Sequence, residues 1–281
     1  MASRPDIHFI DTPHARLRAR VQVVPGAPAV ILMPDAPNTI EHYDPYFALW
    51  AGELTVVAVE MPGFGFSWAN HPEALTYPGA VDAIAHALRG LDLGAMVVTG
   101  PCTLAYVAIG VAAAMPKETL GVVASQATDI PSEREWVRRA IDPEGWLRVP
   151  LIGQMAWSQP ELRERLAIDG WYRAAAGPST DIASWRDTAR WAHNCGCCNA
   201  LATQIQTWFG DATPDVPRVD CPGVILFGQG DRTHRGSDPK GLQVYLPRAE
   251  VRLLAQAGHF PDLEDQSAFQ SAVTDLLKAA K

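Results

Sequence analysis

A cysteine, an aspartate and a histidine lie in sequence contexts that could assemble a nucleophilic site. Residues 97–105, VVTGPCTLA, predict a strand, a sharp turn at Cys102 and then a helix. Such a turn lifts the side chain off the sheet, and the N-terminus of the following helix favours a thiolate. The backbone N–H of Thr103 would face an oxyanion developing on a substrate carbonyl. Cys102 is therefore a candidate nucleophile, with a buried structural cysteine as the alternative.

Two later segments offer the partners that a thiol nucleophile needs. Residues 223–232, GVILFGQGDR, predict a strand ending in a turn that carries Asp231. His259 lies in the loop AGHFPDLED, ahead of the last predicted helix. The histidine could take the thiol proton, and the aspartate could fix the imidazole tautomer. Asp129, after another predicted strand, is a lower-ranked candidate for the acid.

Short apolar runs rich in β-branched residues predict the strands that position these side chains. Continuous runs of this kind suit strands that are buried on both faces, as in a parallel sheet. Strands that alternate with helices predict the α/β class, with a doubly wound, mostly parallel sheet. The predicted strands are 29–33, 54–59, 95–99, 121–124, 223–227 and 251–254, and the predicted helices are 78–91, 103–114 and 267–280.

The region 130–215 interrupts this alternation. It contains no convincing strand and predicts a helical insertion, or cap, within the core. We therefore divide the chain into a first core part at 1–129, the cap at 130–215 and a second core part at 216–281. Seven of the nine tryptophans lie in the cap: Trp136, Trp146, Trp157, Trp171, Trp185, Trp191 and Trp208.

Four motifs, in this order along the chain, resemble the α/β-hydrolase superfamily. EMPGFGFS at 60–67 resembles its D-x-P-G-x-G-x-S segment, and the turn at Cys102 resembles its nucleophile elbow, G-x-S-x-G, with cysteine replacing serine. GQGD at 228–231 is similar to the acid turn, and GHFPDLED to the loop of the catalytic histidine. The resemblance covers roughly residues 20–125 and 216–281. It implies the α/β-hydrolase fold, a Cys102–Asp231–His259 triad and a cap that roofs the active site.

The sequence departs from this pattern beside the nucleophile. Leu104 stands where the elbow normally has glycine, and Pro34-Asp35 stands where most relatives carry His-Gly. By this correspondence the Ala36 N–H would be the second oxyanion donor, with Thr103. An ionised Asp35 would oppose a developing negative charge. Asp35 therefore points away from the site, binds a polar or cationic substrate group, or takes part in proton transfer, and a turn residue that caps local N–H groups is the default interpretation.

The predicted function is that of a hydrolase that cleaves an ester, lactone or thioester through an acyl-enzyme on Cys102. An acyltransferase or cyclase could use the same triad with another acceptor in place of water. A non-catalytic binding protein on a degenerate hydrolase fold is the third possibility, and Leu104 and Asp35 favour it.

The many cap tryptophans favour a small-molecule substrate with an apolar or aromatic group. Candidate substrate-binding residues are Asp35, Tyr43, Trp136 and Trp191. We predict no cofactor and no metal, because the spacing of Cys195, Cys197 and Cys198 is too tight for a structural zinc site.

The composition restricts the partners and the compartment. The formal net charge of the 281-residue chain is −8, which argues against a nucleic-acid partner. No stretch approaches the roughly 18 apolar residues of a membrane-spanning helix, and the polar N-terminus lacks the apolar core of a signal peptide. Five cysteines, an odd number, do not suggest a disulfide scaffold. A cytoplasmic protein without a membrane partner is therefore expected.

Overall fold

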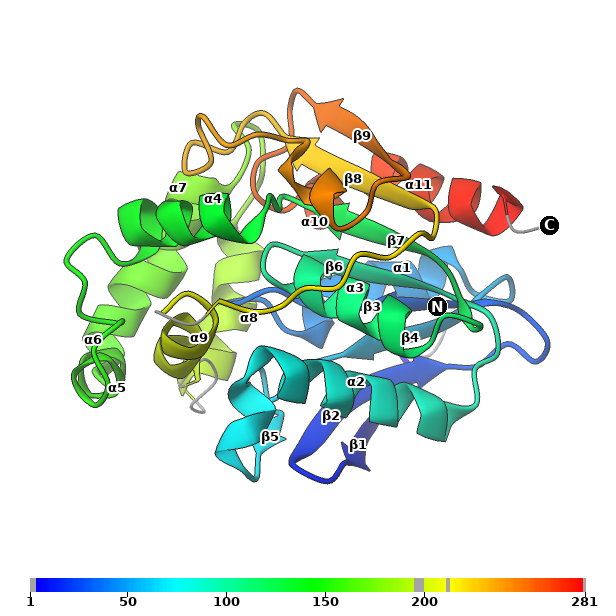
Figure 1. Cartoon of the computed structure of the whole chain (residues 1–281), viewed down its shortest axis with the longest axis horizontal. Coiled ribbons are helices and arrows are strands. Elements are labelled where there is room, and N and C mark those ends of the chain that lie inside the picture. Colours follow the sequence, from blue (N-terminus) through cyan, green and yellow to red (C-terminus); the bar gives the residue numbers. More distant parts are fainter. Residues whose placement is uncertain (1–3, 195–199, 211–212, 280–281) are drawn as a thin grey trace.

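One nine-stranded sheet forms the centre of the protein (Figure 1). The computed structural model describes residues 4–194, 200–210 and 213–279. The strand order is β1-β2-β4-β3-β6-β7-β8-β9, and β5 pairs with β2. The strands are β1 (Ile7–Asp11), β2 (Ala15–Gln22), β3 (Ala29–Leu32), β4 (Thr55–Val59), β5 (Trp68–Ala69), β6 (Met96–Pro101), β7 (Thr119–Ser125), β8 (Gly223–Gly228) and β9 (Ala249–Leu254).

The six strands from β4 to β9 along this order are parallel, whereas β2 runs antiparallel to both β1 and β4. In the parallel part, Val98 of β6 pairs with Ile31 on one side and Val122 on the other. All three side chains are fully buried, as the apolar runs require. The predicted α/β class with a mostly parallel sheet is confirmed.

Helices cover both faces of this sheet. Val98 packs in one core with α2 and α3, and its neighbour Val97 packs in another with α1 and α11. The alternation follows from the strand geometry, which points successive side chains to opposite faces. These helices are α1 (Asp44–Leu49), α2 (Tyr77–Leu91), α3 (Leu104–Ala114) and α11 (Gln266–Ala279), with the short α10 (Pro261–Glu264) before α11.

A helical insertion separates β7 from β8 and gathers at one end of the sheet (Figure 1). No strand occurs among its described residues, as its sequence predicts. Cys195, Cys197 and Cys198 lie outside the described part of the chain. Within the described ranges, no helix is both long and apolar enough to span a bilayer. The insertion consists of α4 (Ile130–Trp136), α5 (Ile152–Trp157), α6 (Pro160–Arg163), α7 (Trp171–Ala175), α8 (Ala183–Asn194) and α9 (Leu201–Trp208), with short helical turns at Val137–Ile141 and Glu164–Gly170.

The antiparallel hairpin of β1 and β2 is absent from the sequence-based prediction. Its second strand contains two buried arginines, Arg18 and Arg20, so it lacks the apolar run of the central strands. Arg18 donates to Glu60 at 3.1 Å and also pairs with Glu41, while Arg20 pairs with Asp44. Ion pairing therefore allows this strand to be buried despite its charged sequence.

Candidate active site

The sharp turn predicted at Cys102 connects β6 to α3. Cys102 adopts the left-handed conformation, with φ of 48°, which is strained for a residue other than glycine. Its N–H donates to the Ser125 carbonyl of β7 at 2.7 Å. A Cβ on Gly100 would collide with the backbone carbonyl of Leu104, so glycine is needed there for the helix to approach the strand. The Leu104 side chain is buried in the core, and the turn forms despite this departure from the usual elbow sequence.

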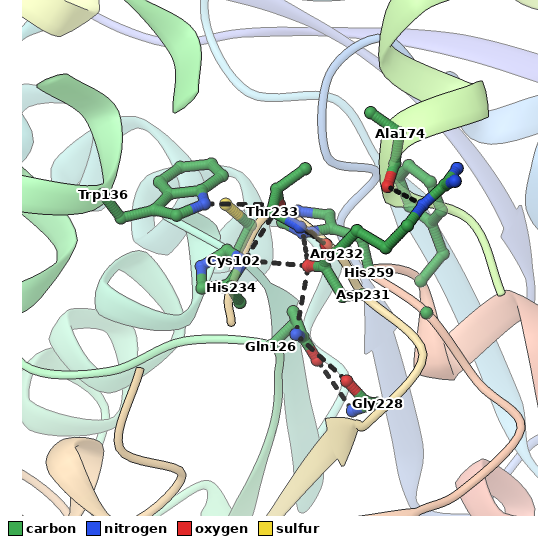
Figure 2. A network of polar contacts seen from close by, with 12 residues as sticks. Cys102, Gln126, Trp136, Ala174, Gly228, Asp231, Arg232, Thr233, His234 and His259 are labelled. Atoms are coloured by element: carbon green, nitrogen blue, oxygen red, sulfur yellow. Dashed lines mark hydrogen bonds and ion pairs between the residues drawn. The ribbon is translucent and has the colours of Figure 1, made fainter. Parts of the chain in front are cut away.

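Cys102, His259 and Asp231 come together at the carboxyl end of the parallel strands (Figure 2). Nδ1 of His259 lies 2.8 Å from Oδ2 of Asp231. Sγ of Cys102, a ring nitrogen of His259 and a carboxyl oxygen of Asp35 lie within 4.8 Å of one another. All four residues are buried. The geometry could pass a proton from sulfur to an imidazole that a carboxylate holds in place.

Asp231 is surrounded by hydrogen-bond donors. Its Oδ1 accepts from N and Oγ1 of Thr233, both at 2.7 Å, and its Oδ2 accepts from Gln126 at 3.1 Å. Oδ2 also lies 2.8 Å from Nδ1 of His234, so two imidazoles share one oxygen. Burial opposes ionisation, but His259 and the hydrogen bond with His234 outweigh it and hold the pKa of Asp231 well below its usual range.

His234 is part of this cluster, although a histidine in a turn is expected by default to face solvent. Its side chain is fully buried, and its ring stacks on Trp136 with centroids 4.2 Å apart. On the far side, Nε2 lies 3.8 Å from Oε1 of the buried Glu133, and the same oxygen is 3.8 Å from Sγ of Cys102. The three-residue spacing from Asp231 was the one sequence signal for this contact; nothing in the sequence indicated Glu133.

Cys102 and His259 influence each other's ionisation. Burial, reinforced by Asp35, raises the pKa of the Cys102 thiol, which outweighs the thiolate preference expected from the helix N-terminus. Burial also disfavours the imidazolium, but the charges of a Cys102 thiolate and Asp231 outweigh it and raise the pKa of His259. A thiolate at Cys102 and an imidazolium at His259 therefore stabilise each other, while burial disfavours either charge alone.

A cavity of about 660 Å³ opens onto Cys102. Asp35, Ala36, Cys102 and Thr103 line its end at the sheet, and Gln204 donates to the Thr103 hydroxyl at 3.4 Å. Residues of the helical insertion form most of the remaining wall and are mostly apolar, including Trp136, Trp157, Leu162, Trp171, Ile205 and Phe209. This shape can hold an apolar or aromatic group against the sulfur.

Three residues considered at the sequence level lie elsewhere. Trp191 of α8 is 51% exposed and packs on the ring of Phe66, so it faces away from the cavity. Tyr43 is buried, and its hydroxyl donates to the carboxyl of Asp262. Neither residue is among those that line the cavity. Asp129 accepts from the N–H of Ser132 at 2.8 Å and caps α4 instead of serving as the acid.

The fold and the position of the site define a hydrolase of the α/β type. The chain belongs to the alpha/beta hydrolase family, whose sequence model matches residues 23–271. No curated protein matches the chain.

Solved structures share the fold over nearly the whole chain. A protein from Klebsiella pneumoniae, provisionally named an epoxide hydrolase, is 19% identical with a TM-score of 0.76, and the match covers 96% of each chain. An epoxide hydrolase from Bacillus megaterium is 15% identical with a TM-score of 0.75, covering 96% of this chain and 100% of the other. A haloalkane dehalogenase variant from Bradyrhizobium elkanii is 14% identical with a TM-score of 0.73, covering 97% and 96%. Likeness at these identities extends to the fold alone.

Proposed function

We propose that this hydrolase cleaves an ester, lactone or thioester through a covalent thioester on Cys102. One observation carries the proposal. Cys102 sits at a strained turn with its sulfur within 4.8 Å of a ring nitrogen of His259, and Nδ1 of His259 lies 2.8 Å from Asp231. A nucleophile, a base and a group that orients the base are thus present in one buried cluster.

The reaction follows from the roles that these positions permit. As Sγ of Cys102 bonds to the substrate carbonyl carbon, Nε2 of His259 takes the thiol proton and the carbonyl electrons move to oxygen. Collapse of this intermediate breaks the bond to the leaving group, which receives the proton from His259. Water then attacks the thioester with His259 as base, the C–S bond breaks, and the sulfur regains its proton. Asp231 stabilises the imidazolium that forms in both halves.

The cavity supports a small molecule with an apolar or aromatic acyl group. Its walls come from the helical insertion, and we therefore propose that residues 130–215 act as a cap over the site. Trp136 lines the same cavity as Cys102, so its side chain would pack against such an acyl group. The N–H of Thr103, in the same wall, is the proposed backbone donor to the oxyanion.

A cysteine nucleophile does not suit epoxide hydrolysis or haloalkane dehalogenation, the activities for which the similar structures are named. A thiolate that opened an epoxide or displaced a halide would form a thioether. A thioether has no carbonyl carbon for water to attack, so the enzyme would not regain its thiol. A thioester can be hydrolysed, and acyl transfer is therefore the reaction that returns Cys102 to its starting state.

Intact-mass spectrometry after mixing with p-nitrophenyl butyrate tests the proposal. We expect a butyryl adduct on Cys102 with release of p-nitrophenol. Cys102→Ala should lower the release rate by on the order of a thousandfold or more, as loss of a nucleophile does in comparable triads. Cys221→Ala is the matched control, because Cys221 is the other free cysteine among the described residues. An unchanged rate in Cys102→Ala, or an adduct only on Cys221, would refute the covalent mechanism.

A further inference from the structure

A carboxyl group occupies the position expected for an oxyanion donor. Asp35 follows β3, lines the cavity and has a side chain that is only 9% exposed. Its Oδ2 lies 3.5 Å from Nε2 of His259, and its carboxyl is within 4.8 Å of the Cys102 sulfur. Of the roles left open by the sequence, pointing away from the site is therefore excluded.

Asp35 and Asp231 differ sharply in what surrounds them. Asp231 has five hydrogen-bond contacts, which suit a buried carboxylate. In the part of the chain that the structure describes, the ion-pair partner of the Asp35 carboxyl is Nε2 of His259, at 3.5 Å. A buried carboxylate with so few donors is costly, whereas a neutral carboxylic acid is not.

The charged and titratable groups around Asp35 add to this effect. Burial raises the pKa of Asp35, the neighbouring His259 opposes the shift, and Glu133 reinforces it. Asp35 in turn raises the pKa of both Cys102 and Asp262, which shows that these acidic groups disfavour each other's ionisation. The titratable groups that interact electrostatically with Asp35 are Tyr43, Cys102, Glu133, His259 and Asp262.

We propose that Asp35 is a neutral carboxylic acid in the resting enzyme and that its O–H donates a hydrogen bond to the substrate carbonyl oxygen during attack by Cys102. The inference rests on the proposed function, and it makes Asp35 a catalytic residue opposite the Thr103 N–H. A carboxylic acid then does the work that a backbone N–H does in an ordinary oxyanion hole. No proton leaves Asp35, since the hydrogen bond alone stabilises the oxygen as it gains charge.

The matched variants Asp35→Asn and Asp35→Ala separate donation from proton transfer. The amide of asparagine keeps an N–H donor, so Asp35→Asn should retain p-nitrophenyl butyrate acylation to within about tenfold. Asp35→Ala has no donor and should lose roughly 100- to 1,000-fold, the usual effect of removing one oxyanion donor. Wild-type acylation should also fall as pH rises through the pKa of Asp35, because the donor proton is lost, and Asp35→Asn should lack this fall. Equal loss in both folded variants would refute the donor role.

Infrared difference spectroscopy tests the protonation of Asp35 without any substrate. We expect a carboxylic-acid C=O band near neutral pH that shifts in D2O and is missing from Asp35→Asn. Asp262→Asn is the control, because it removes a second buried carboxyl with a raised pKa and should leave the Asp35 band in place. If the band is absent from the wild type, the inference is wrong. If the band is present but the wild type forms no acyl-enzyme, the proposed function fails while the protonation of Asp35 stands.

Discussion

Replacement of Asp231 by asparagine should destabilise the protein far more than an isosteric change normally does. The carboxylate lies between two buried imidazoles, and Nδ1 of each is 2.8 Å from the same oxygen. An asparagine at this position cannot carry the charge that stabilises both rings. If its side-chain oxygen faces His234 and His259, its NH2 group faces the two donors of Thr233. At least one set of buried donors therefore loses its acceptor.

The size of the effect follows from the contacts. A net hydrogen bond to a charged group contributes roughly 1.5–3 kcal/mol, and five such contacts in one cluster are not additive. Removal of one partner of a buried charged pair typically costs about 3–5 kcal/mol, which we take as the expected loss for Asp231→Asn. For a chain of this length, that corresponds to a decrease in Tm of roughly 10 °C.

Urea denaturation near pH 7, followed by tryptophan fluorescence, measures the loss. Asp275→Asn is the matched control, since Asp275 is an exposed aspartate that accepts hydrogen bonds from Arg252 at 2.9 Å and from Ser271 at 3.3 Å. That variant should lose at most about 1 kcal/mol. A loss in Asp231→Asn no larger than the loss in Asp275→Asn would show that the two imidazoles do not depend on the carboxylate, and would refute the network as described.

Two further predictions concern other buried groups. His234→Phe keeps a ring to stack on Trp136 but removes one of the contacts to Asp231, and should lower the free energy of unfolding in urea by about 1–3 kcal/mol; an unchanged midpoint would contradict this. Burial raises the pKa of Glu60 to about 7, and the charge of Arg18 opposes this shift. In the unfolded chain the pKa of a glutamate is about 4.3. The contribution of Glu60 to stability is therefore fully present below about pH 4.3 and is lost as pH rises through 7. Glu60→Gln should therefore reduce the loss of wild-type stability between pH 5 and pH 8, and identical pH profiles would contradict the prediction.

The central strands were predictable because burial on both faces leaves a continuous apolar run in the sequence. The run 29–33 became β3, and 223–227 became β8, each within a residue or so at its ends. The sequence of β2, ARLRARVQ, has charged residues at every second position from Arg16 to Arg20. A pattern of single residues cannot show that Glu60, some 40 positions away, pairs with Arg18 and permits its burial.

In the candidate site too, residues in local sequence motifs were predictable, whereas residues positioned by distant contacts were not. The order of Cys102, Asp231 and His259 was visible because each follows a strand in a motif with its own local sequence. His234 looked like a solvent-facing residue, because its burial depends on Trp136, which belongs to a helix nearly 100 positions earlier. The orientation of Asp35 was equally undetermined, since a turn residue can point inward or outward with the same sequence.

Asp35 and Asp231 show how two carboxyls in one site acquire opposite tasks. Asp231 has five hydrogen-bond contacts and holds two rings, so its ionised form is bound into the structure and its removal should cost stability and catalysis together. Asp35 pairs with His259 and faces the cavity, so little of the fold depends on its charge. The difference in donors around each group, rather than the residue type, decides which acid is ionised and which retains a proton that it can offer to substrate. Substitutions at Asp35 should therefore lower the rate of acylation with little change in the free energy of unfolding. Substitutions at Asp231 should lower both quantities together.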